Sequence, residues 1–125
     1  MLGIRHVALR VKDLSKSLEF YTRTLGMRVE WQPDNTNAYL TSGSDNLALH
    51  QIAPADPIGV ASGGLDHFGL LVSSPGEVDF WAAKLKAEGV VLAQEAKTHR
   101  DGARSIYFRD PDGFLIQLLY HPPIS

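Results

Sequence analysis

Cysteine does not occur in the 125-residue chain. Its absence excludes a thiolate nucleophile, a cysteine-ligated zinc ion, an iron–sulfur cluster and a disulfide framework. Any metal that the protein binds must therefore be held by imidazole and oxygen ligands.

Long apolar runs and an excess of basic charge are also missing. Arg5, His6 and Arg10 interrupt the N-terminal segment, and no later stretch approaches the roughly 20 apolar residues of a membrane span. Twelve Lys and Arg against fourteen Asp and Glu give a net charge of -2, with no basic tract that could follow a nucleic-acid backbone. We therefore expect a cytoplasmic protein that binds neither membranes nor nucleic acid.

An internal repeat organises the single domain, residues 1–125. The segment IRHVALRV around His6 is matched by LDHFGLLV around His67, and the two histidines lie about half a chain length apart. The repeat predicts two tandem modules, residues 1–58 and 64–125. A segment rich in Pro, Gly and Ala, from Ala53 to Gly64, suits the connection between them.

Each module reads as a strand, a helix and three further strands. Strict alternation marks the first strands, and apolar residues spaced by three and four mark the helices. Capping residues precede both helices and glycines follow them, Gly26 after residues 14–25 and Gly89 after the second helix. The sequence thus predicts an α+β fold of two βαβββ modules, whose remaining strands cover residues 28–32, 37–42, 46–51, 90–95, 104–109 and 114–120.

The two histidines occupy equivalent positions of the repeat. His6 lies on the strand face opposite Val7, Leu9 and Val11, and His67 lies on the corresponding face of the second module. A single strand histidine is usually an ordinary polar residue. If the modules pair about a pseudo-twofold axis, however, both imidazoles converge on one concave surface, which favours a shared site.

Three longer motifs resemble a known family. The segments HVALRVKDLSKSLEFYTRTLGM, LDHFGLLV and YFRDPDGFLIQLLYH are similar to the vicinal oxygen chelate superfamily, which includes glyoxalase I, fosfomycin-resistance enzymes, bleomycin-resistance proteins, methylmalonyl-CoA epimerase and extradiol dioxygenases. The resemblance implies that the strands of each module form a half barrel, that the two modules enclose a cleft, and that the cleft holds a divalent metal. It also suggests a homodimer.

The resemblance also implies which positions would hold the metal. His6 and His67 match the first-strand ligands, whereas Ala48 and Gln117 stand at the last-strand positions, so both expected carboxylates are absent. His50 shares the face of Ala48 and could either supply a third imidazole or bind substrate at the rim of the cleft. The predicted ligands are therefore His6, His67, Gln117 and His50, and the predicted metal is iron, zinc, manganese or nickel.

Other polar residues could face the same cleft. Tyr107 could act as a hydrogen-bonding acid or pack within the barrel, and His121 shares the face of Gln117. His99 falls in a polar stretch, residues 97–102, that we interpret as an exposed loop over the cleft. Arg10 and Arg104 could meet an anionic substrate group, although structural salt bridges are the commoner role of such residues.

These features favour a small-molecule enzyme whose metal chelates two adjacent substrate oxygens. Glyoxalase and epimerase chemistry needs a base beside the metal, and neither Ala48 nor Gln117 supplies one. The sequence therefore favours dioxygenase-like chemistry over true glyoxalase I activity, with Tyr107 and His50 as candidate catalytic residues. The alternative is a metal-free protein of the bleomycin-resistance type that sequesters a ligand.

Overall fold

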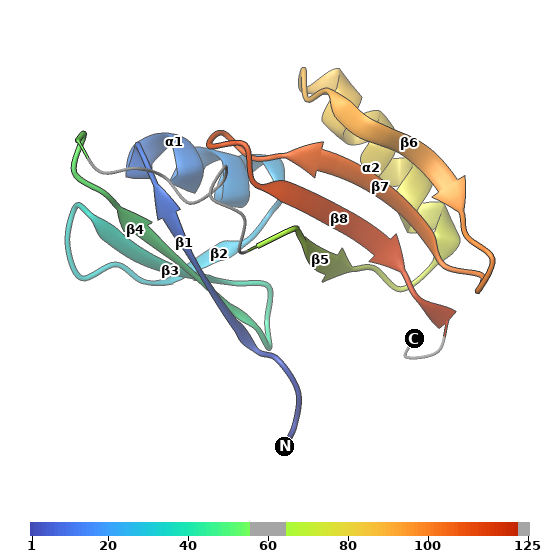
Figure 1. Ribbon diagram of the computed structural model, residues 1–125, viewed down its shortest axis with the longest axis horizontal. Coiled ribbons are helices and arrows are strands. Elements are labelled where there is room, and N and C mark those ends of the chain that lie inside the picture. Colours follow the sequence, from blue (N-terminus) through green and yellow to red (C-terminus); the bar gives the residue numbers. More distant parts are fainter. Residues whose placement is uncertain (56–64, 123–125) are drawn as a thin grey trace. The chain divides into compact units, whose positions relative to one another are not determined.

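The same order of secondary-structure elements occurs twice along the chain (Figure 1). The computed structural model describes residues 1–55 and 65–122, and the chain divides into two compact units, Met1–Gly64 and Leu65–Ser125. The predicted module boundaries at residues 58 and 64 lie outside the described residues, as does the predicted linker beyond Ala55.

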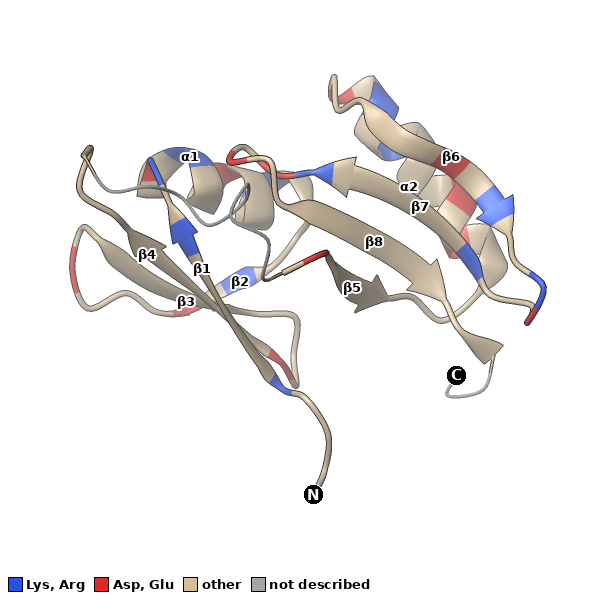
Figure 2. Cartoon of the chain, viewed as in Figure 1, with Lys and Arg blue, Asp and Glu red and all other residues tan. Residues whose placement is uncertain are grey.

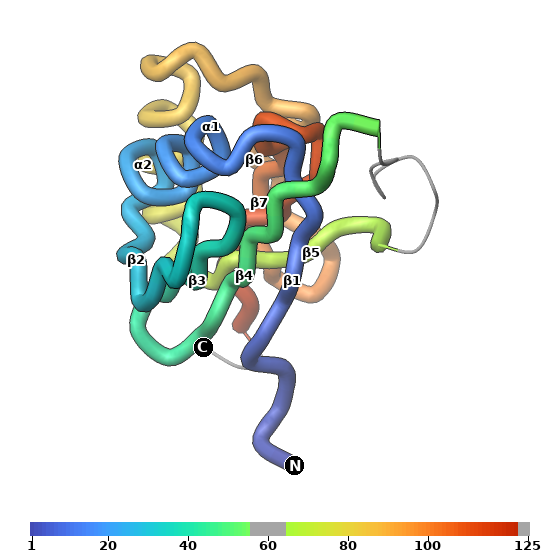
Figure 3. Tube along the Cα trace, turned by 90° about the vertical axis from the view of Figure 1, so that its left-hand side faces the viewer, coloured from blue at the N-terminus to red at the C-terminus, as the bar shows by residue number. Residues whose placement is uncertain are grey.

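The first unit builds one four-stranded mixed sheet and one helical segment. Its elements are β1 (His6–Val11), α1 (Leu14–Glu19), the π-helix η1 (Phe20–Thr24), β2 (Arg28–Trp31), β3 (Asn37–Thr41) and β4 (Asn46–Gln51). The spatial order is β1-β4-β3-β2, and Figure 3 shows β4 between β1 and β3. Strands β1 and β4 are parallel, and the other neighbours are antiparallel.

The second unit repeats this arrangement. Its elements are β5 (Phe68–Leu71), α2 (Pro75–Ala87), β6 (Leu92–Thr98), β7 (Arg104–Arg109) and β8 (Leu115–Tyr120). The spatial order β5-β8-β7-β6 corresponds to that of the first unit, again with one parallel pair, β5 with β8. The predicted α+β fold of two tandem βαβββ modules is therefore confirmed.

The first helical segment follows the predicted bounds but changes its winding. The Asp13 side chain caps its first turn, as the sequence indicates. The Leu25 N–H then donates to the Phe20 carbonyl at 3.0 Å, five residues back, which is the wider spacing of a π-helix. Gly26 ends the segment with a φ of 82°, a conformation that glycine adopts without strain.

The second helix and the strand after it differ slightly from the prediction. The Ser74 side chain accepts a hydrogen bond from the Glu77 N–H at 3.3 Å, which caps α2. At the other end the Val90 N–H still donates to the Leu85 carbonyl, so Val90 closes the end of the helix instead of starting the next strand. Strand β6 therefore begins later than predicted, and its pairing with β7 carries it on to Thr98.

One face of each sheet is buried against the helix of its own unit. Apolar residues alternate on that face, and burial of such a side chain stabilises the fold by about 1.5–3 kcal/mol. The buried residues on the strands include Leu9, Val11, Leu40, Leu47 and Leu49 in the first unit and Ile106, Phe108, Ile116 and Leu118 in the second.

Among the described residues, no helix combines the length and apolar character needed to cross a bilayer.

Candidate functional site

The opposite face of the first sheet carries the predicted histidines. In the parallel ladder of β1 with β4, His6 pairs with Asn46 and Arg10 pairs with His50. This register places His6 on the same face as Ala48 and His50, and the prediction that His50 shares the face of Ala48 is confirmed. Between them lies Ala48, which is fully buried and has no side-chain donor atom.

A short chain of polar side chains fixes the ring of His6. Its Nδ1 lies 2.6 Å from the amide oxygen of Asn46, and the Asn46 amide nitrogen donates to the Glu30 carboxylate at 3.2 Å. An amide oxygen only accepts hydrogen bonds, so Nδ1 of His6 carries the proton. Nε2 is then the ring nitrogen that remains for another ligand.

His50 is held in the same way by other residues. Its Nδ1 lies 2.6 Å from the amide oxygen of Asn37, whose amide nitrogen donates to the Asp34 carboxylate at 3.0 Å. Hydrogen bonds from the backbone N–H of Thr36 and from the Asn37 side chain lower the pKa of Asp34. The ring of Tyr39 packs edge-on against the His50 imidazole, with 5.8 Å between the centroids.

His67 follows the pattern in the second unit. Its Nδ1 lies 2.5 Å from the Asp66 carboxylate, which can only accept. The ring lies edge-on to Tyr107 at a centroid distance of 5.3 Å. Tyr107 in turn pairs across the ladder with Gln117, so these three predicted site residues form one group on β7, β8 and the segment before β5.

All three predicted histidine ligands are thus oriented in the same way. A side-chain oxygen lies against each Nδ1, and within residues 1–55 and 65–122 no hydrogen bond engages Nε2 of these rings. Metal-binding histidines in proteins are oriented by hydrogen bonds of this kind. The partners Asn46, Asn37 and Asp66 were not among the predicted site residues, although Asp66 is the neighbour of His67 in the sequence.

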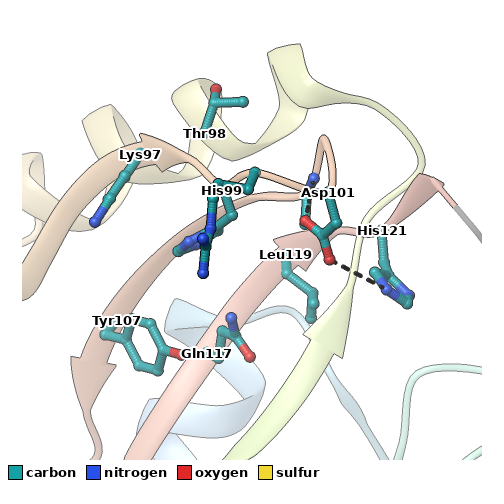
Figure 4. A pocket seen from close by; sticks show the side chains of 10 residues that line it. Lys97, Thr98, His99, Asp101, Tyr107, Gln117, Leu119 and His121 are labelled. Carbon is teal, nitrogen blue, oxygen red and sulfur yellow. Dashed lines mark hydrogen bonds and ion pairs between the residues drawn. The ribbon is translucent and has the colours of Figure 1, made fainter.

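A polar pocket of about 720 Å³ opens on the second sheet beside Gln117 and Tyr107 (Figure 4). Tyr107, for which the sequence left a place in the cleft or in the barrel packing open, lines this pocket together with Gln117, and His121 lines it too, as its spacing from Gln117 predicts. The pocket is lined by Lys97, Thr98, His99, Arg100, Asp101, Ala103, Tyr107, Gln117, Leu119 and His121.

His99 lies in the loop after β6, as predicted, but the expectation that it is exposed is wrong. Lys97 and Thr98 belong to β6, and the half-buried His99 ring is tied through Nε2 to the hydroxyl of the buried Ser105 at 2.8 Å. Strand β6 pairs with β7 as far as Thr98 opposite Arg104, so the next residue, His99, lies close to Ser105.

Arg104 has a structural role. Its guanidinium binds the Asp79 carboxylate at 2.7 Å and the Thr98 hydroxyl at 2.9 Å. This agrees with the expectation that a salt bridge is the commoner role of such an arginine.

The imidazole nitrogens and the amide oxygen of the predicted ligands are donor atoms that suit a divalent metal ion, although no carboxylate is among them. Within residues 1–55 and 65–122, no group of three or more His, Asp and Glu side chains is arranged to hold a metal ion. The predicted ligands are instead distributed, with His6 and His50 in the first unit and His67 and Gln117 in the second. Their free imidazole Nε2 atoms and one amide oxygen are donors that iron, zinc, manganese and nickel accept.

Comparison with known proteins identifies the family. The model of the Glyoxalase/Bleomycin resistance protein/Dioxygenase superfamily matches residues 3–118. The chain belongs to this superfamily. The resemblance seen in the sequence is therefore confirmed across nearly the whole chain, and with it the vicinal oxygen chelate fold.

Individual superfamily members are moderately similar. The chain is 31% identical to a probable lactoylglutathione lyase of Vibrio cholerae over 93% of its own length and 88% of the relative. It is 32% identical to a glutathione transferase, FosA, of Serratia marcescens, over 93% and 79% of the two lengths. The crystal structure of lactoylglutathione lyase from Agrobacterium tumefaciens has the same fold, with a TM-score of 0.79, 22% identity and coverage of 96% and 94%.

Proposed function

We propose that this superfamily member is an enzyme that binds a divalent metal ion and acts on a small molecule with two adjacent oxygens. The observation that carries the proposal is the common orientation of His6, His50 and His67, each with Nδ1 against a side-chain oxygen and with no hydrogen bond to Nε2 from the described residues. The proposed ligands are His6, His67 and Gln117, with His50 as a further imidazole donor. When bound, the ion would act as a Lewis acid on the two oxygens.

The protein's own residues would orient the substrate. The Tyr107 ring is fixed by its contact with His67, so its hydroxyl is positioned to donate a hydrogen bond to a substrate oxygen in the pocket. In the first unit His50 is held by Asn37 and Tyr39, so its Nε2 can bind either the ion or a polar group of the substrate. We therefore propose Tyr107 and His50 as catalytic residues.

The same residues favour one branch of the superfamily's chemistry. A lyase or isomerase of the glyoxalase kind needs a base to remove a proton from carbon. Ala48 has no such group, and the neutral amide of Gln117 is not a base. We propose dioxygenase-like chemistry, which does not require a carboxylate base at these positions.

The homodimer and the cytoplasmic location expected from the sequence stay predictions.

Metal analysis tests this proposal. The protein would be purified without chelator, supplied with Fe²⁺, Zn²⁺, Mn²⁺ or Ni²⁺, desalted, and analysed for metal per chain. We expect stoichiometric metal in the wild type and loss of it in His6→Ala and in His67→Ala. His121→Ala is the matched control, because it removes an imidazole of the second unit that is outside the proposed ligand set, and it should keep its metal.

Two results would contradict the proposal. A wild type that retains none of the four ions would exclude the metal enzyme and leave the metal-free, ligand-sequestering protein as the better interpretation. Retention of the metal in both His6→Ala and His67→Ala, with unchanged circular dichroism, would show that the ion binds elsewhere.

A further inference from the structure

The connection between β2 and β3 is built around one carboxylate. Oδ1 of Asp34 accepts hydrogen bonds from the Thr36 N–H at 2.9 Å and from the Thr36 hydroxyl at 3.1 Å. The Asn37 amide nitrogen donates to the same carboxylate, at 3.0 Å from Oδ1 and 3.2 Å from Oδ2. The hydrogen bond from the Thr36 N–H lowers the pKa of Asp34 most, and that from the Asn37 side chain adds to it. Asp34 is therefore ionised at neutral pH, and an ionised carboxylate only accepts hydrogen bonds.

This carboxylate decides which way the Asn37 amide points. The oxygen and the nitrogen of an amide are nearly equal in shape, so their hydrogen-bond partners determine its orientation. With its nitrogen against Asp34, Asn37 presents its oxygen to His50, and this oxygen lies 2.6 Å from the ring Nδ1. An amide oxygen only accepts, so the proton of that hydrogen bond belongs to Nδ1. In the neutral ring the acceptor nitrogen is then Nε2.

A second carboxylate from the same part of the chain stands in the same relation to His6. The register of β2 with β3 shifts on passing Glu30, as in a β-bulge, and bulges re-aim side chains near functional sites. Glu30 accepts from the Asn46 amide nitrogen at 3.2 Å, and the Asn46 oxygen lies 2.6 Å from Nδ1 of His6. Strands β3 and β4, which carry the two asparagines, contain no charged residue (Figure 2). Both carboxylates therefore come from residues 30–34.

We propose that Asp34 is a positioning residue: through Asn37 it keeps the proton of the neutral His50 ring on Nδ1 and leaves Nε2 to contact the ion or the substrate. Asp34 touches neither of them and acts only through the asparagine. The use of Nε2 in this way rests on the proposed function. The tautomer itself is a property of the metal-free protein, because hydrogen bonds within the first unit set it.

Glu30 has the same role for His6, through Asn46. The two imidazoles of the first unit then present the same nitrogen because one segment, residues 30–34, supplies both carboxylates. This segment is therefore a positioning element of the candidate site, although none of its residues is among the predicted ligands.

The test measures the tautomers in the full-length protein after treatment with chelator. At about pH 9, above the usual titration range of histidine, two-bond ¹H–¹⁵N correlations show which ring nitrogen carries the proton. We expect the Nδ1–H form for His50 and His6 in the wild type. In Asp34→Asn the new amide can also donate, so the Asn37 amide can turn over. The ratio of Nδ1–H to Nε2–H in His50 should then fall about fivefold or more, and Asn37→Ala should change it in the same direction.

Two further variants separate this effect from loss of charge or of a turn. Glu30→Gln should change the tautomer ratio of His6 and leave that of His50, the reverse of Asp34→Asn. Asp45→Asn is the matched control, because Asp45 closes the turn between β3 and β4 by accepting from the Ser42 N–H at 2.6 Å. Within residues 1–55 and 65–122 none of its hydrogen bonds leads to an imidazole, so both ratios should stay unchanged.

The outcomes separate this proposal from the proposed function. The positioning role is wrong if His50 of the wild type carries its proton on Nε2, or if Asp34→Asn alters the ratio no more than Asp45→Asn does. A protein that shows the expected tautomers and yet retains no metal would contradict the proposed function and still support the control of the His50 ring by Asp34.

Discussion

The turn between β7 and β8 depends on one buried carboxylate, and its removal should destabilise the second unit measurably. Asp110 is 6% exposed, and its Oδ1 accepts hydrogen bonds from the backbone N–H groups of Asp112 and Phe114, both at 2.9 Å. Replacement by alanine leaves both N–H groups without this acceptor. Hydrogen bonds to a charged group contribute about 1.5–3 kcal/mol each, but water can reach the half-buried Asp112 N–H, so we expect a total loss of about 3 kcal/mol.

Urea denaturation followed by circular dichroism measures this loss directly. For a chain of this length a loss of about 3 kcal/mol corresponds to a decrease in Tm of about 10 °C. Asp110→Asn is the control, because its amide oxygen can accept the same two hydrogen bonds without the charge, and it should lose about half as much. If Asp110→Ala unfolds within about 1 kcal/mol of the wild type, the two hydrogen bonds do not stabilise the turn as argued.

Two further substitutions test the proposed metal ligands. Gln117→Glu places a carboxylate at the last-strand position and so adds a negative charge to the proposed ligands. The affinity for Mn²⁺ or Zn²⁺, measured by calorimetry, should increase about tenfold. An unchanged affinity would show that Gln117 does not contact the ion. Asn46→Ala removes the hydrogen-bond acceptor of His6 and should lower metal affinity about 10-fold to 100-fold. Asn46→Asp keeps an acceptor and should retain most of the affinity. Equal affinities in the two variants would exclude a role of Asn46 in orienting the His6 ring.

The elements that the sequence predicts well are those whose signal is local. Strand alternation, the caps at Asp13 and Ser74, and the glycines after the helices each depend on a few neighbouring residues, and the structure confirms them. The end of β6 depends instead on pairing with β7, more distant in the chain, so its extension to Thr98 could not be read from residues 90–98 alone.

The candidate site was predictable only where its signal is local in the sequence. The shared face of His6 and His50 follows from the period of a strand and from the parallel pairing of β1 with β4. The partner of His6 does not, because Asn46 is 40 residues away and reaches the ring only through that ladder. The exposure of His99 was predicted wrongly, because its contact with the buried Ser105 forms only when β6 and β7 pair.

The hydrogen bonds behind the three histidines bear on the missing carboxylate ligands. None of the fourteen acidic residues stands at a matched ligand position, yet Glu30, Asp34 and Asp66 each lie one or two hydrogen bonds behind an imidazole. Negative charge placed there can balance a cation at the outer nitrogen without occupying a coordination position. A metal ion held by these imidazoles, as we propose, would therefore keep more of its coordination sphere open to substrate oxygens than an ion held by direct carboxylate ligands.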